Sequence, residues 1–247
     1  MGVSSAESLS VFFPACNEQD IIGDTVESAR TVLAGLTGDF EIIVVDDGSA
    51  DRTAAIVEGI AARDERVRLV RHGRNRGYGA ALRSGFASAR KQLVFFSDAD
   101  GQFDLAELPG LLALLSKATV VLGYRIRRSD PPHRLVIAKV YNLIIRAVFG
   151  LRVRDIDCAY KLFRRDVLRE VSLESNGAFI SSELLIKLRR RGVAMVELGV
   201  HHYPRTTGVS KGATVGVILK TVRDIIRLKL GLPLNPRAQA VGDGGEG

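Results

Sequence analysis

The chain has 247 residues, of which 46% are hydrophobic and 26% charged, so it is long enough for one large α/β domain or two small ones with a sizeable core. Its net charge of +7 favours an anionic partner, such as nucleic acid, a membrane surface or a phosphorylated substrate. Two cysteines, Cys16 and Cys158, exclude a disulfide framework or a cysteine metal site, and we expect both to be reduced in an intracellular protein. The N-terminus lacks a secretory signal and no apolar run reaches the roughly 18 residues of a spanning helix, so any membrane contact should be peripheral.

Strand and helix patterns alternate along the first half of the chain. Apolar runs predict strands at 9–13, where Pro14 ends the strand, and at 41–45, 67–70, 93–96 and 120–123. Helical periodicity predicts helices that begin at Asn17 or Glu18, and at about residues 51, 80 and 105. This alternation predicts an α/β fold with a mostly parallel central sheet covered by helices on both faces. Without an internal repeat or linker, a single domain is expected.

The second half is less regular. We expect a short strand within 155–163, a helix at 179–191 and a strand at 194–200. The stretches 135–151 and 214–230 combine apolar and basic faces, which suits either a helix in a membrane headgroup region or packing against the core. The expected boundaries are a flexible N-terminus at 1–7, a domain at 8–232 with halves 8–124 and 125–232, and a disordered tail at 233–247.

An acidic turn follows the strand predicted at 93–96. Asp98, Asp100 and Gln102 alternate in the sequence, so their side chains could converge beyond the carboxyl end of that strand. Open α/β sheets bind ligands there, and oxygen ligands suit a hard cation that takes the rest of its shell from phosphates, such as those of a nucleotide sugar. A lone Asp-x-Asp would by itself favour a plain polar turn.

Two other turns suggest nucleotide binding. Asp46 and Asp47 follow a strand expected to be buried, where a carboxylate can accept a hydrogen bond from a base, although a plain turn is an equal alternative. The segment 71–76 is basic, and Gly77 and Gly79 would let its backbone approach a diphosphate. The alternative is a solvated basic loop, and the dinucleotide pattern G-x-G-x-x-G is absent.

The motifs together resemble family 2 glycosyltransferases of the type A fold, and more narrowly the dolichyl-phosphate mannose synthases and bacterial polyprenyl-phosphate glycosyltransferases. The segments that carry the resemblance are FPACNE (12–18), VVDDGSADRT (44–53), NRGYGAALRSGF (75–86), SDADGQFD (97–104), the stretch 125–138 and VSKG (209–212). They occur in the order and approximate spacing of the family, between about residues 10 and 230. The resemblance implies a single-domain, Rossmann-like type A glycosyltransferase fold.

The resemblance also implies site residues and ligands. The nucleotide-sugar site, for a GDP- or UDP-hexose, would comprise Pro14, Ala15, Asn17, Glu18, Asp46, Asp47, Gly77, Asp98, Ala99 and Asp100. Mg²⁺ or Mn²⁺ would be held by Asp98, Asp100 and Gln102. The catalytic set would be Asp98, Asp100, Arg125, Arg134 and Lys211.

The basic members of the catalytic set would bind the phosphate of a polyprenyl acceptor. Arg125, Arg134 and Lys211 would supply charge-assisted hydrogen bonds, unless the arginines form a solvated face. The chain departs from these relatives at Ala138, where they tend to have serine, and in DIDCAYK (155–161), where they more often have DPTSGFR.

A phosphate acceptor would need no catalytic base, because its second pKa of about 6 leaves it anionic near neutrality. The expected reaction is a single displacement that inverts the anomeric carbon. If the acceptor were instead a hydroxyl of a soluble compound or glycan, Asp155, Asp157 and Glu183 would be candidate bases, although Glu183 better suits a helix N-terminal charge. We expect a location at the cytoplasmic face of a membrane, with a membrane-embedded subunit as one potential partner. A non-catalytic subunit is less consistent with the acidic turn, because a binding-only subunit has no need of a metal site. Nucleic-acid binding is less consistent with the basic loops, because no aromatic residues for base stacking are interleaved among their basic residues.

Overall fold

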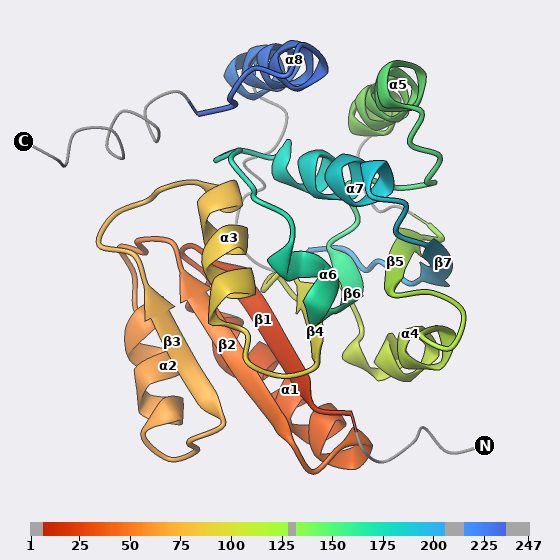
Figure 1. Cartoon of the computed structure of the whole chain (residues 1–247). Helices are drawn as coiled ribbons and strands as arrows, with labels where there is room; N and C mark the ends of the chain where they lie inside the picture. Colours follow the sequence, from red (N-terminus) through yellow and green to blue (C-terminus); the bar gives the residue numbers. More distant parts are fainter. Residues whose placement is uncertain (1–6, 128–131, 206–214, 236–247) are drawn as a thin grey trace, which may run out of the picture.

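A computed structural model describes residues 7–127, 132–205 and 215–235, with only the backbone for 132–134 and 215. These residues build a seven-stranded sheet in the order β3-β2-β1-β4-β6-β5-β7 (Figure 1). The strands are β1 (Leu9–Ala15), β2 (Phe40–Asp46), β3 (Val67–Arg71), β4 (Leu93–Ser97), β5 (Val120–Arg125), β6 (Tyr160–Arg164) and β7 (Met195–Val200). Only β6 is antiparallel to its neighbours, so the mostly parallel α/β fold is confirmed.

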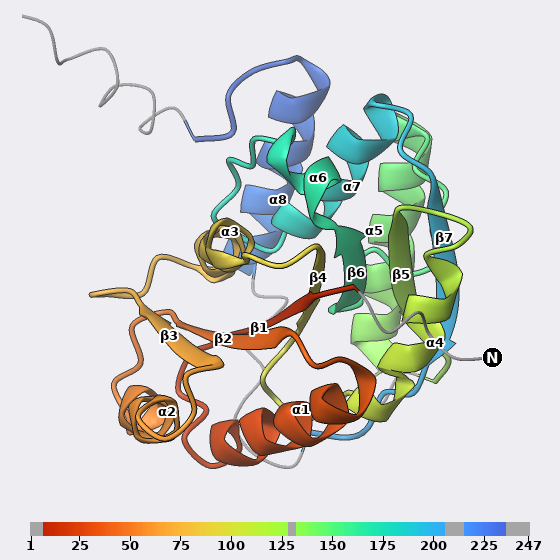
Figure 2. The ribbon, with the colours of Figure 1, turned by 60° about the horizontal axis from the view of Figure 1, so that its bottom comes forward.

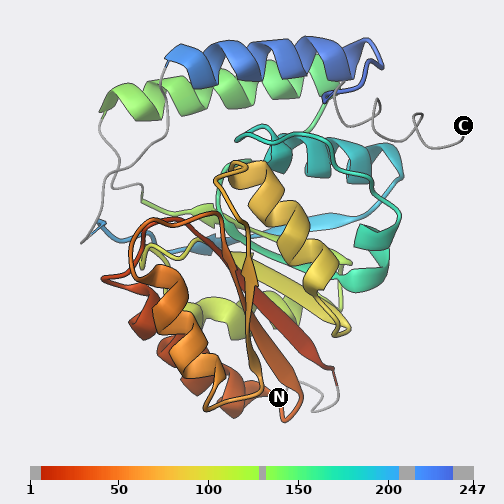
Figure 3. The same ribbon diagram turned by 90° about the vertical axis from the view of Figure 1, so that its left-hand side faces the viewer.

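Helices cover both faces of the sheet (Figure 2). They are α1 (Ile22–Leu36), α2 (Thr53–Ala61), α3 (Tyr78–Ser88), the 3-10 turn η1 (Leu105–Glu107), α4 (Leu108–Leu114), α5 (Pro132–Phe149), α6 (Arg165–Arg169), α7 (Ile180–Arg190) and α8 (Val215–Lys229). The apolar faces of α1, α2 and α4 pack on one side, and those of α3 and α7 on the other. Side by side, α5 and α8 form an outer layer over α7 (Figure 3).

Two predicted boundaries near the start of the chain are wrong. The strand β1 does not end at Pro14 but continues to Ala15. Proline is tolerated there because β1 pairs with β4 only as far as Phe12, so the missing N–H of Pro14 interrupts no hydrogen bonds to that strand. The helix α1 begins at Ile22 and not at Asn17, whose φ of 58° is left-handed and incompatible with a helix start. The predicted halves also share the sheet, since β6 lies between β4 and β5.

The chain ends pack in part against the domain. Glu7, which belongs to the segment predicted to be flexible, accepts a hydrogen bond from Arg164 at 2.6 Å. Leu234, in the predicted tail, is buried, and its backbone N–H donates to Glu174 at 2.8 Å. The remaining residues of both predicted segments lie outside the described ranges, apart from Pro233 and Asn235.

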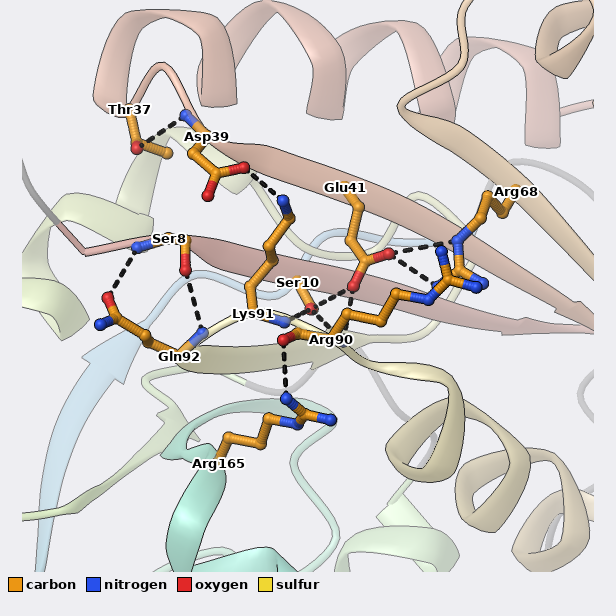
Figure 4. A network of polar contacts seen from close by, with 10 residues as sticks. All are labelled: Ser8, Ser10, Thr37, Asp39, Glu41, Arg68, Arg90, Lys91, Gln92 and Arg165. Atoms are coloured by element: carbon orange, nitrogen blue, oxygen red, sulfur yellow. Dashed lines mark hydrogen bonds and ion pairs between the residues drawn. The ribbon is translucent and has the colours of Figure 1, made fainter.

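A buried carboxylate joins the amino-terminal ends of the central strands (Figure 4). Glu41 accepts hydrogen bonds from Ser10 Oγ at 2.6 Å, from the Arg90 backbone at 2.7 Å and from Arg68 Nη2 at 2.7 Å. Burial raises the pKa of Glu41, but these hydrogen bonds and the Arg68 charge outweigh it, so the pKa lies below its ordinary value. The network therefore stabilises the end of the sheet opposite to the strand ends from which the acidic turns project.

Close backbone packing joins the start of α3 to the loop before α7. The backbone N–H of Gly79 donates to the carbonyl of Asn176 at 3.1 Å. A Cβ at Gly79 would lie 2.2 Å from the carbonyl oxygen of Ser175, and one at Gly77 would lie 2.4 Å from that of Asn176. Gly77 also has a φ of 95°, which L-residues rarely adopt. Glycine is therefore required at both positions for this contact.

We predict that Gly79→Ala lowers the free energy of unfolding by about 1–3 kcal/mol, because the added methyl group meets backbone atoms that have little freedom to move. The matched control is Gly59→Ala in the exposed part of α2, where nothing lies within 4 Å of the new Cβ. That control should gain up to about 1 kcal/mol from helix propensity. Urea unfolding measures both, and equal stabilities would show that the loop before α7 yields easily.

Candidate functional site

A cavity of about 890 Å³ opens where β1, β2 and β4 end. Its walls come from the segments 14–18, 75–81, 98–100 and 176–179, with Asp47, Arg205 and one face of α8. The volume is in the range of small-ligand sites, and the position is where open α/β sheets bind ligands.

The cavity brings together most of the residues predicted to bind a nucleotide sugar. The members on its wall are Pro14, Ala15, Asn17, Glu18, Asp47, Gly77, Asp98, Ala99 and Asp100. The exception is Asp46, which is buried and does not line the cavity.

Hydrogen bonds between two turns hold the wall formed by residues 14–18. The Asn17 side chain accepts from the backbone of Ala50 at 2.8 Å, and its own N–H donates to Ser49 Oγ at 2.9 Å. The backbone N–H of Glu18 donates to Thr53 Oγ1 at 2.9 Å. These contacts stabilise the left-handed conformation of Asn17 and connect the turn after β1 to the turn after β2.

The adjacent carboxylates after β2 have different surroundings. Asp47 pairs with His72 Nδ1 at 2.7 Å and accepts from the backbone N–H groups of Arg76 at 2.9 Å and Gly77 at 2.8 Å. Asp47 therefore holds the basic loop against the cavity. In contrast, Asp46 Oδ2 is buried and makes no hydrogen bond with any described residue, and Arg71 Nε lies 3.8 Å from it.

The predicted metal turn brings its two carboxylates together but not its amide. Tyr78 donates to Asp98 Oδ1 at 3.0 Å, and Arg205 Nη2 donates to Asp100 Oδ2 at 2.6 Å. Both aspartates line the cavity, whereas Gln102 does not, and its Nε2 donates to the carbonyl of Tyr203 at 2.9 Å. The predicted convergence therefore holds for Asp98 and Asp100 only.

The two carboxylates are held close in a buried setting. Burial, followed by repulsion from Asp100, raises the pKa of Asp98 to about 7, although Tyr78, Lys161 and Arg125 act in the opposite direction. A divalent cation would relieve this repulsion, and carboxylate oxygens are the donors that Mg²⁺ and Mn²⁺ favour. Among the described residues no group of three His, Cys, Asp or Glu side chains could hold a metal, so a cation here would depend on further ligands.

The predicted acceptor cations are not gathered on the described cavity wall. Arg125 Nε and Nη2 donate to the two oxygens of Asp155 at 2.6 and 2.7 Å, and this pairing raises the Arg125 pKa despite burial. Arg125 still lies close enough to Asp98 to lower the pKa of that carboxyl. Arg134 belongs to α5, but its side chain is outside the described part, as is all of Lys211.

Two of the candidate bases have structural partners. Asp155 pairs with Arg125, as described above. Glu183 is buried and accepts from the backbone N–H groups of Glu174 at 2.9 Å and Ser175 at 2.8 Å, and from Lys187 Nζ at 2.7 Å. Glu183 therefore stabilises the loop before α7. The sequence suggested only a charge near the helix N-terminus and did not predict these contacts.

Sequence reasoning missed several cavity residues. Tyr78, which hydrogen-bonds Asp98, lies in the motif 75–86 that was quoted for its glycines, and Arg205, which hydrogen-bonds Asp100, lies just before the motif 209–212. On α8, the wall residues are Val217, Lys220, Thr221 and Asp224. Their helical spacing was a usable signal, but it does not reveal that these residues line the cavity while Leu219, Val222 and Ile226 are exposed.

Comparison with known proteins identifies the family. Residues 10–172 match the sequence model of glycosyl transferase family 2. The chain is 31% identical over 239 residues to glycosyltransferase AglD of Haloferax volcanii. This alignment covers 93% of this chain but only 38% of the longer AglD protein.

Solved structures share the fold. Glucosyl-3-phosphoglycerate synthase of Mycobacterium tuberculosis, in complex with phosphoglyceric acid, is 23% identical, with a TM-score of 0.70 over 94% of this chain and 82% of that one. The same enzyme in complex with Mn²⁺, uridine diphosphate and glucosyl-3-phosphoglycerate gives a TM-score of 0.69 at 23% identity, with the same coverage. The chain therefore has the type A glycosyltransferase architecture. The family model matches a region that includes the turns after β1, β2 and β4, and on this match the chain belongs to glycosyl transferase family 2.

Proposed function

We propose that this protein transfers a hexose from a UDP- or GDP-sugar in a reaction that depends on a divalent cation. The observation that carries the proposal is the pair Asp98 and Asp100 on the wall of a cavity of about 890 Å³ at the strand ends. The Mycobacterium tuberculosis enzyme of similar fold has been crystallised with Mn²⁺ and UDP, which supports the same ligand classes here.

The chain's own residues account for how the donor would be held. Asp98 and Asp100 would hold Mg²⁺ or Mn²⁺ together with oxygens of the diphosphate, and the bound cation would stabilise the charge of the leaving diphosphate. Tyr78 orients Asp98 through its 3.0 Å hydrogen bond. The backbone N–H of Gly77 is held by Asp47, so this carboxylate would act on the donor through the loop. Asp46 does not line the cavity and lies 3.8 Å from Arg71, so a direct contact with the base is assigned to neither carboxylate after β2.

We propose a polyprenyl phosphate as the acceptor, positioned by Arg125, Arg134 and Lys211 at the cytoplasmic face of a membrane. The supporting observation is an apolar outer surface on α5 and α8. Its exposed members are Val136, Ile137, Val140, Leu143, Ile144, Ile218, Leu219, Val222 and Ile226. Exposed basic residues, such as Lys139 and Arg146, flank it. Such a surface suits the headgroup region of an anionic membrane. No described helix is long and apolar enough to cross a membrane.

A soluble phosphorylated acceptor is the second candidate. The synthase of similar fold is described with phosphoglyceric acid, which also carries a phosphate. A polyprenyl phosphate would itself be the nucleophile, would be largely anionic near neutral pH and would not require a base, whereas the hydroxyl of a soluble acceptor would require one. The engagement of Asp155 and Glu183 in structural contacts supports the phosphate nucleophile.

We predict that Asp100→Asn abolishes the part of UDP or GDP affinity that depends on Mn²⁺, because a neutral amide is a poor ligand for a hard cation. The matched control is Asp104→Asn, which alters a carboxylate of the same loop that caps η1 and does not line the cavity. Calorimetry with and without Mn²⁺ measures the effect. Unchanged Mn²⁺ dependence in Asp100→Asn would remove this residue from the metal site.

We predict that Arg134→Ala slows transfer to polyprenyl phosphate by about ten- to hundredfold, equivalent to roughly 1.5–3 kcal/mol for a charged hydrogen bond. Hydrolysis of the sugar nucleotide by water should persist, because the donor site lies elsewhere. The control is Arg127→Ala, an exposed arginine of the same stretch. A near-normal rate for Arg134→Ala, with unchanged dependence on lipid concentration, would favour the soluble acceptor.

We predict that Leu143→Glu combined with Leu219→Glu releases the protein from vesicles of phosphatidylglycerol and phosphatidylcholine. Each side chain is 65% exposed, so the change should disturb the surface but not the core. Deleting α8 would be less informative because α8 lines the cavity. The control, Ala34→Glu combined with Ala55→Glu, adds the same charge at exposed positions of α1 and α2. Equal vesicle binding by both variants in a flotation assay would show that the apolar surface of α5 and α8 does not bind the membrane. Absence of binding by the wild type would indicate that this surface contacts a protein partner or serves the packing of the fold.

A further inference from the structure

Arg205 joins two turns of the cavity wall, the one after β1 and the one after β4. It follows β7, and its side chain is 23% exposed. Its Nη2 donates to Asp100 Oδ2 at 2.6 Å, and its Nη1 lies 3.6 Å from Glu18 Oε1. The guanidinium thus links the turn after β4 to the turn after β1, at the carboxylate proposed to hold a divalent cation.

We propose that Arg205 is a built-in counter-ion of Asp100 that competes with the divalent cation, so that binding of the cation releases the guanidinium. This inference rests on the proposed function, since it assumes that Asp100 is a metal ligand. A guanidinium 2.6 Å from Oδ2 occupies the space in which a cation would contact that oxygen. A divalent cation and the guanidinium would also repel one another at such short range, so both cannot hold the same oxygen.

One further oxygen on each of the two carboxylates already accepts a hydrogen bond. Asp100 Oδ1 accepts from the backbone N–H of Gln102 at 3.2 Å, and Asp98 Oδ1 accepts from Tyr78 at 3.0 Å. Each oxygen keeps a further lone pair, but these contacts orient the carboxylates. Binding of a cation to Asp100 is therefore expected to involve the side that Arg205 occupies.

The surroundings of Arg205 suit a side chain that exchanges partners. Its Nε is buried and makes no hydrogen bond with any described residue, so the guanidinium is incompletely satisfied where it lies. The backbone just before it is held, because Tyr203 N–H donates to the Gln102 carbonyl at 2.9 Å and Gln102 Nε2 donates back to Tyr203 at 2.9 Å. Rotation of the side chain alone would thus free Asp100 without detaching the segment.

Exchange of partners couples the cation to an anionic ligand. In the absence of an anion, the released guanidinium would exchange its 2.6 Å hydrogen bond to Asp100 for water and the more distant Glu18, which weakens the affinity for the cation. When a nucleoside diphosphate enters the cavity, Arg205 can exchange Asp100 for a phosphate oxygen. The cation should therefore bind more tightly with the nucleotide than without it, and by reciprocity the nucleotide should bind more tightly with the cation.

The experiment measures Mn²⁺ binding to the full chain by calorimetry, first without nucleotide. Arg205→Gln should bind Mn²⁺ about three- to tenfold more tightly than the wild type, because a charged competitor has been removed. Arg205→Lys, which keeps the charge, should remain close to the wild type. The control, Lys220→Gln, removes a cation from the α8 side of the same cavity and should change the affinity by less than about twofold.

The second measurement adds UDP or GDP. The increase in Mn²⁺ affinity caused by the nucleotide should be smaller in Arg205→Gln than in the wild type, which a purely structural role would not produce. Unchanged or weaker Mn²⁺ binding by Arg205→Gln, or an equal gain in Lys220→Gln, would overturn the proposal. Absence of Mn²⁺ binding in both Arg205→Gln and the wild type would also overturn it. If Arg205→Gln fails to fold, as judged by its thermal unfolding, Arg205→Met serves as the neutral variant.

The same experiment separates this inference from the proposed function. If Asp100→Asn binds Mn²⁺ as tightly as the wild type, the metal assignment itself is wrong. If Arg205→Gln binds Mn²⁺ more tightly but the wild type transfers no sugar, the competition stands while the proposed activity fails.

Discussion

The close approach of two backbone segments shapes the site. Gly77 and Gly79 let the start of α3 contact the loop before α7, where any side chain would meet carbonyl oxygens. Arg83 donates to the Ser175 carbonyl and to Asn176 Oδ1 across the same junction. Because the loops on both sides line the cavity, this contact joins walls that come from distant parts of the sequence. The cavity is therefore built by one sheet and its loops, without a separate substrate domain in the described residues.

The charges beneath the site balance its acidic turn. Burial lowers the pKa of Lys161, a β6 side chain whose Nζ donates to the carbonyl of Ile156 at 3.0 Å. Lys161 and Arg125 both act to lower the pKa of Asp98, whereas burial and Asp100 act to raise it. Arg125 on β5 and Lys161 on β6 thus oppose the rise in the pKa of Asp98 that burial and Asp100 cause. The buried Lys161 and the partly buried Arg125 consequently contribute to the electrostatics of the site.

The outer helices connect the cavity to its surroundings. The inner face of α8 supplies Lys220 and Asp224 to the cavity wall, whereas Leu219 on the outer face is exposed. The inner face is mixed, since Ile225 and Leu228 are also buried there, whereas the outer face exposes several large apolar side chains. Under the proposed function, this exposed apolar face would lie against the membrane that carries the acceptor.

The sequence by itself determined most of the element types, the mostly parallel α/β fold and the turns after β1, β2 and β4 that line the cavity. It could do so because strand and helix periods, strand-end aspartates and glycines are local signals. Tertiary structure alone decided that Asp47 holds a loop, that Gln102 lies off the cavity wall and that Arg205 contacts Asp100. Each depends on contacts between segments far apart in the sequence, such as the 105 positions that separate Arg205 from Asp100. Burial and side-chain direction arise only when the sheet brings such segments together, and no local pattern encodes them.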